Sequence, residues 1–222
     1  MATYLLGIDD AGRGPVIGPM VLAGILIPKE QEEQLKQLGV KDSKLLQPIK
    51  RRAIAEHLKS YQHAIELAFP DEIDARGFAG TNLNKIEAVK AAKIINKLIE
   101  NYQDIEVIID CPSRNIPAWH AYLLKYIKQA DKIILKCEHE ADFNHPVVSA
   151  ASIIAKETRE QAIAKIKQEH NIEFGSGYCH DPLTSKFLKG DISHLQDKGL
   201  IRKSWYTYTK LIAEKEQKEL EF

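Results

Sequence analysis

Apolar and polar positions follow two different periods along this chain, and together they predict both strands and helices. Short apolar runs bounded by glycine, proline or polar residues predict strands over residues 4–8, 20–28, 61–69, 105–110 and 132–137. Apolar side chains at helical spacing predict helices over residues 29–38, 48–60, 82–102, 117–126, 146–170 and 205–222. The first strands follow one another and the later strands alternate with helices, which predicts an α/β fold with a mixed sheet flanked by helices.

Length and composition narrow the class of protein. The 222 residues suffice for one substantial domain, and we expect a core over residues 1–174 and a C-terminal helical region over 175–222, with Gly175 at the boundary. The 31 basic and 31 acidic residues cancel, so net charge does not indicate a nucleic-acid partner. Three cysteines without a CxxC motif, no secretion signal and no membrane-spanning apolar run lead us to expect a cytoplasmic protein.

The most informative segment is the end of the first predicted strand, where Asp9 and Asp10 precede Gly12, Arg13 and Gly14. Asp-Asp before glycine is also common turn chemistry. Neighbouring residues of a strand point to opposite faces, so both acids can serve one site only if the strand ends or bulges there. A divalent metal would give the pair a function, and the arginine would suit a phosphate.

Two further acids follow other strands. Asp110 ends the run from 105 to 110, and Asp142 lies between the strand over 132–137 and the helix that starts at Pro146. In an α/β sheet, sites form at the carboxyl edge of the strands. Carboxylates with open positions suit Mg²⁺ or Mn²⁺, and two such ions would support phosphodiester hydrolysis. We therefore expect Asp9, Asp10, Asp110 and Asp142 to be both catalytic and metal-binding.

Several segments together resemble the type 2 ribonuclease H family, especially its archaeal ribonuclease HII form. They are the opening Gly7-Ile-Asp-Asp-Ala-Gly-Arg-Gly-Pro-Val-Ile-Gly-Pro-Met20, Lys41-Asp-Ser-Lys44, Ala141-Asp142, Pro146-Val-Val-Ser-Ala-Ala-Ser-Ile-Ile-Ala-Lys156, Gly175-Ser-Gly-Tyr178 and Asp181-Pro182. The resemblance implies an RNase H-like core and a monomeric enzyme. It implies cleavage of the RNA strand of RNA–DNA hybrids and incision of DNA duplexes 5′ of an embedded ribonucleotide, leaving 3′-hydroxyl and 5′-phosphate ends.

The same resemblance assigns roles to residues that would bind substrate. Gly12, Arg13 and Gly14 match the turn that holds the ribose 2′-hydroxyl through backbone contacts, and Tyr178 matches the tyrosine that stacks on the sugar at the RNA-to-DNA junction. The 2′-hydroxyl is the group that distinguishes RNA from DNA. Lys44 is expected to contact a phosphate, with a solvated surface lysine as the alternative.

Asp10 departs from the family pattern, which usually has glutamate at this position. The aspartate is shorter by one C–C bond, about 1.5 Å, so direct metal ligation, ligation through water and altered metal preference all stay open. Two other functions also stay open: an integrase- or resolvase-like DNA nuclease of the same fold, and a hybrid-binding protein whose catalysis Asp10 impairs.

Two C-terminal features carry further expectations. Lys186, Lys189, Lys198, Arg202, Lys203 and Lys210 form a local basic excess that fits either a nucleic-acid surface or a solvated helical face. Trp205 nearby could stack on nucleic acid or anchor the last helix in the core. The end of the chain, from Gln217 to Phe222, faintly resembles the peptide by which replication proteins bind sliding clamps, with a frayed amphipathic helix end as the alternative.

Overall fold

The computed structural model describes residues 2–40, 47–190 and 192–220 and divides them into two compact units. The first comprises Met1–Ala11, Val21–Leu67 and Asn84–Thr158, and the second comprises Gly12–Met20, Ala68–Leu83 and Arg159–Phe222. Each unit therefore draws on separated parts of the chain. The boundary expected at Gly175 stays a prediction.

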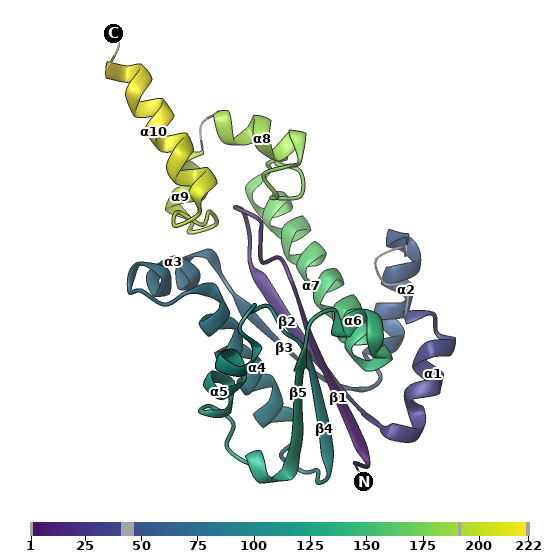
Figure 1. The fold of residues 1–222 in the computed structure, drawn as a ribbon. Helices are drawn as coiled ribbons and strands as arrows, with labels where there is room; N and C mark the ends of the chain where they lie inside the picture. The colour runs from purple at the N-terminus through teal and green to yellow at the C-terminus, as the bar shows by residue number, and fades with distance from the viewer. Residues whose placement is uncertain (1, 41–46, 191, 221–222) are drawn as a thin grey trace. The chain divides into compact units, whose positions relative to one another are not determined.

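A five-stranded mixed sheet forms the centre of the first unit (Figure 1), with strand order β3-β2-β1-β4-β5. Its strands are β1 (Tyr4–Ala11), β2 (Met20–Pro28), β3 (Gln62–Ala68), β4 (Ile105–Asp110) and β5 (Ile133–Glu138). Strand β1 pairs antiparallel with β2 and parallel with β4, and β4 pairs parallel with β5. The α/β fold with a mixed sheet is confirmed.

Helices cover both faces of this sheet (Figure 1). On one face, α1 (Glu32–Gln37), α2 (Pro48–Leu58) and the start of α7 (Pro146–His170) share a core with alternate residues of β1 and β2. Gly7 lies where a side chain would overlap the backbone of α7 at Val147. On the other face lies α4 (Leu83–Leu98), whose Ile94 packs against Gly24. Next to α4 lies α5 (Ile116–Leu124), where the Trp119 indole donates to the Asn84 carbonyl.

The second unit packs short helices around its own apolar core. Its elements are α3 (Pro70–Phe78), α8 (Pro182–Lys189), α9 (Ser193–Asp197), α10 (Tyr206–Leu220) and the end of α7. Buried residues of the core include Ile17, Phe174, Leu188 and Leu195. In the described part of the chain, no helix is both long and apolar enough to cross a membrane.

Two local expectations differ from the structure. Strand β1 continues through Asp9 and Asp10 to Ala11 instead of ending at Ile8, because β2 pairs with it without a bulge as far as Val21. Helix α3 was not expected, since its start, Pro70-Asp-Glu, precedes too few apolar residues to give a helical period.

Candidate active site

Parallel pairing brings Asp9 and Asp110 to one edge and one face of the sheet. The pairing of β1 with β4 ends at Ile8 and Ile109, and an aspartate is the next residue of each strand. Because residues in parallel register on neighbouring strands point to the same face, the two carboxylates leave the sheet together. Leu5 lies on the same face of β1 as Asp9, and Ile108 lies on the same face of β4 as Asp110. Both apolar residues belong to the core that α7 covers, so the two carboxylates leave the sheet on that face.

Asp9 is a buried carboxylate among like charges. Its side chain is 7% exposed, and one oxygen, Oδ1, accepts the backbone N–H of Asp10 at 2.7 Å. Burial raises the pKa of Asp9 well above its ordinary value, and the negative charges of Asp10 and Asp110 raise it further. The Ser152 hydroxyl and the Asp10 N–H oppose that rise. A cation would remove this electrostatic cost, because it favours the charged form of each acid.

A short helix joins Asp142 to the same edge of the sheet. The backbone N–H of Ala141 donates to Oδ1 of Asp110 at 3.0 Å, and Asp142 is the next residue. Helix α6 (Ala141–Asn144) begins here after Glu140, which has a left-handed backbone conformation with φ of 56°. Asp142 itself is 5% exposed. The sharp turn at Glu140 therefore places Asp142 directly after Ala141, whose N–H donates to Asp110.

Asp10 is the member of the set that the fold places differently. Alternation along the regular strand β1 directs its side chain to the face opposite Asp9. Within the ranges that the structure describes, no group of three or more His, Cys, Asp or Glu side chains is arranged to hold a metal ion. The acids thus share an edge, but their side chains are not closed around a common point.

The second unit contains the Gly-Arg-Gly turn (Gly12, Arg13 and Gly14) together with Tyr178. A methyl group on Gly14 would lie 3.7 Å from the Tyr178 ring, which is ordinary van der Waals contact. Gly12 has a φ of +87°, and a Cβ there would overlap the Arg159 side chain and the Pro19 carbonyl. Gly12 is therefore required by the fold, whereas Gly14 is exposed and has room.

Hydrogen bonds of Asp181 fix the loop that carries Tyr178. The Asp181 carboxylate accepts the Ser176 N–H at 2.6 Å, the Ser176 hydroxyl at 2.7 Å and the Leu183 N–H at 2.9 Å. These bonds, with that of the Ser176 hydroxyl first, lower the pKa of Asp181 to about 2. Behind Tyr178, the Arg159 guanidinium lies 5.0 Å from the ring centroid and donates to the Ser176 carbonyl.

Two of the residues that shape the second unit, Arg159 and Arg202, were not recognised from the sequence. Arg159 follows a run of helix-forming residues with no distinguishing spacing, while Arg202 was counted among the basic surface residues. That assignment of Arg202 is wrong, because its side chain is fully buried and donates to backbone carbonyls. Of the two alternatives for Trp205, the structure supports the anchor: Trp205 packs on the apolar core, and its indole donates to the Gly14 carbonyl at 3.2 Å. Lys44 lies outside the described residues.

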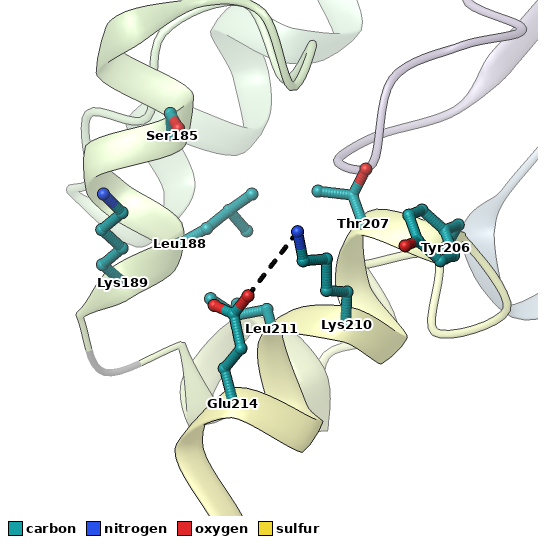
Figure 2. Close-up of a pocket in the computed structure, with 8 residues that line it drawn as sticks. All are labelled: Ser185, Leu188, Lys189, Tyr206, Thr207, Lys210, Leu211 and Glu214. Carbon is teal, nitrogen blue, oxygen red and sulfur yellow. Dashed lines mark ion pairs between the residues drawn. The ribbon is translucent and has the colours of Figure 1, made fainter. Parts of the chain in front are cut away.

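A pocket of about 360 Å³ separates α8 from α10 within the second unit. It is lined by Ser185, Leu188, Lys189, Tyr206, Thr207, Lys210, Leu211 and Glu214 (Figure 2). Lys210 pairs with Glu214 at 3.7 Å.

The five lysines of the basic excess are all exposed. Their role as a nucleic-acid surface stays a prediction.

Comparison with known proteins decides the family. The family model described as Ribonuclease HII matches residues 6–208. The chain belongs to the ribonuclease HII family. It is accordingly a ribonuclease H endonuclease, an endoribonuclease that acts on RNA–DNA hybrids.

Individual ribonucleases HII match over nearly their whole length. Ribonuclease HII of Methanococcus maripaludis strain C6 is 40% identical over 221 residues, which are 97% of this chain and 90% of that protein. The crystal structure of ribonuclease H2 from Pyrococcus horikoshii has a TM-score of 0.80 at 34% identity, covering 94% of this chain and 96% of that one. The ribonuclease HII in a complex with PCNA from Archaeoglobus fulgidus has a TM-score of 0.79 at 34% identity, covering 91% and 95%. The expected family is confirmed.

Proposed function

We propose that this chain is a divalent-metal-dependent endonuclease that cuts the RNA strand of RNA–DNA hybrids and incises DNA duplexes on the 5′ side of an embedded ribonucleotide. Its products would carry 3′-hydroxyl and 5′-phosphate ends. The observation that carries the metal dependence is the burial of Asp9 beside Asp10 and Asp110, which leaves a desolvated carboxylate in need of a cation.

We assign metal binding to Asp9, Asp10, Asp110 and Asp142, with Asp10 acting through a bound water because its side chain leaves β1 on the face opposite Asp9. Hard carboxylate oxygens favour Mg²⁺ or Mn²⁺, and no histidine or cysteine is needed in the set. Two such ions, when bound, supply an activated water and stabilise the oxygen that leaves. The protein's own contribution is to fix Asp9 and Asp110 through the paired strands, and Asp110 also through the Ala141 N–H.

We assign recognition of the ribonucleotide to the Gly-Arg-Gly turn and Tyr178. An exposed glycine at position 14 lets another backbone approach closely, and the ring beside it offers a flat apolar surface for a sugar. Contact with a 2′-hydroxyl would restrict cleavage to ribonucleotides.

One assay tests the proposal against its alternatives. Three matched duplexes would be compared in Mg²⁺, Mn²⁺ and EDTA: DNA with one ribonucleotide, the same sequence in DNA only, and a long RNA–DNA hybrid. We expect incision 5′ of the single ribonucleotide and along the hybrid, only with metal. Cutting of the all-DNA duplex would instead indicate an integrase- or resolvase-like nuclease. Binding to the hybrid without cutting would indicate a binding protein.

Asp10→Glu is expected to change how the activity depends on the metal. The longer side chain reaches about 1.5 Å further from the backbone, which alters its access to an ion. The parent is expected to be active, and the ratio of its rates in Mg²⁺ and Mn²⁺ should differ from that of the variant. Asp10→Asn, which keeps the length and removes the charge, is the control. Identical metal profiles for parent and Asp10→Glu would contradict this prediction.

We also propose that the segment from Gln217 to Phe222 binds a sliding clamp. Support comes from the Archaeoglobus ribonuclease HII, whose structure was determined in a complex with PCNA. Phe222, the aromatic residue of the motif, lies outside the described residues. Deleting residues 217–222 is expected to abolish capture by an immobilised cognate clamp while cleavage of a free duplex continues. Equal capture of both forms would refute the proposal.

A further inference from the structure

Arg202 holds the carbonyl side of the Gly-Arg-Gly turn from within the second unit. Its guanidinium donates to the Gly12 carbonyl at 2.6 Å, to the Arg13 carbonyl at 2.7 Å and to the Gly18 carbonyl at 3.0 and 3.2 Å. The side chain is 0% exposed. A buried charge is costly unless it is well hydrogen-bonded, and the planar, five-donor guanidinium suits several acceptors at once.

The direction of these carbonyls fixes the direction of the neighbouring N–H groups. In a planar trans peptide, the carbonyl of one residue and the N–H of the next point in opposite directions. Because Arg202 draws in the carbonyls of Gly12 and Arg13, the N–H groups of Arg13 and Gly14 point away from it. The next carbonyl, of Gly14, accepts the Trp205 indole, and the residue that follows is Pro15, which has no N–H. The turn thereby presents donors on the side away from Arg202.

Other contacts hold Arg202 in place besides its bonds to the Gly-Arg-Gly turn. Its backbone N–H donates to the Val16 carbonyl at 2.9 Å, and its guanidinium stacks 4.8 Å from the Trp205 ring centroid. The next two residues are held by Asp74 of α3, which accepts the N–H of Lys203 at 2.6 Å and that of Ser204 at 2.9 Å. Arg202 is thus a fixed support against which the turn is set.

We infer that Arg202 is a positioning residue for recognition of the ribose 2′-hydroxyl. It keeps the Gly-Arg-Gly turn in the conformation that directs the Arg13 and Gly14 N–H groups toward an acceptor oxygen. This inference rests on the proposed role of the turn and adds the residue that enforces it. It also takes Arg202 out of the phosphate-binding surface, since a fully buried guanidinium cannot reach a phosphate.

The test measures selectivity for the 2′-hydroxyl. Dissociation constants would be determined in EDTA for a duplex with one ribonucleotide and for the matched all-DNA duplex, using the full chain. Selectivity is the dissociation constant of the all-DNA duplex divided by that of the duplex with one ribonucleotide. Because Arg202→Gln loses charged hydrogen bonds to the turn, we expect it to reduce this ratio by about tenfold. Arg202→Lys keeps the charge without the planar fork and should give a smaller loss.

Leu195→Ala is the stability-matched control, since it truncates a buried side chain of the same unit without touching the turn. Its ratio is expected to equal that of the parent. An unchanged ratio in Arg202→Gln, or an equal loss in Leu195→Ala, would overturn the inference. If Arg202→Gln does not fold, Arg202→Lys decides: a lower ratio than that of the parent supports the inference, and an unchanged ratio overturns it. A parent without any preference would refute the proposed role of the turn itself.

Discussion

Replacing Asp9 with asparagine is expected to reduce cleavage strongly and, in metal-free buffer, to raise the free energy of unfolding. The loss of activity should be on the order of 10²–10³-fold or more, the range for removing one preorganised electrostatic group. The gain in stability follows from the raised pKa, because a carboxylate buried beside Asp10 and Asp110 is less favourable than its neutral form. Cleavage rates and thermal unfolding in EDTA measure the two effects.

The pH dependence of the stability difference follows from the same shift. An acid whose pKa is raised by folding weakens the folded state above its unfolded pKa, about 3.9 for aspartate. The advantage of Asp9→Asn should therefore vanish in acid, where Asp9 is protonated in both states, and grow as pH rises. Asp131→Asn, at an exposed aspartate, is the matched control and should change neither quantity. A variant less stable than the parent at neutral pH would contradict the electrostatic argument.

Adding metal gives a second comparison of the parent with Asp9→Asn. An ion that binds only the folded protein stabilises it by about 2.7 kcal/mol at one hundred times its dissociation constant. Mn²⁺ should therefore raise the unfolding midpoint of the parent more than that of Asp9→Asn. Equal shifts would show that Asp9 does not bind the ion.

Gly12→Ala and Gly14→Ala are expected to lower activity for two different reasons. At Gly12 the backbone is left-handed and a Cβ would lie 2.8 Å from the Pro19 carbonyl, so alanine should cost about 2–4 kcal/mol of stability. At Gly14 the side chain has room beside Tyr178, so stability should stay within about 0.5 kcal/mol of the parent. Under the proposed recognition of the ribonucleotide, the added methyl group would nevertheless stand where the ribose approaches.

Denaturant unfolding and cleavage of the single-ribonucleotide duplex separate these effects. Gly14→Ala should lose activity at unchanged stability, with the larger change in KM if the methyl group obstructs binding. Full activity in Gly14→Ala would show that Gly14 does not contact the 2′-hydroxyl. Unchanged stability in Gly12→Ala would show that the turn can adopt another conformation.

The sequence by itself determined the strands, most helices and the positions of the four acids along them. Periodicity is a local property, and the run from Ile105 to Asp110 needs no distant residue to be recognised as a buried strand. Parallel order then implies a shared edge for Asp9, Asp110 and Asp142. The family motifs predicted a substrate-binding role for Tyr178, which periodicity alone does not distinguish, and that role stays a prediction.

Only the tertiary structure decided how charge is distributed around these residues. The raised pKa of Asp9 depends on burial under α7 and on Asp110 of another strand, and neither is visible in the residues next to Asp9. Arg202 looked like a solvated basic residue because its acceptors at Gly12 and Arg13 lie 190 and 189 residues away in the sequence. Whether a charged side chain faces solvent or holds a backbone turn depends on such long-range contacts, and local pattern carries no information about them.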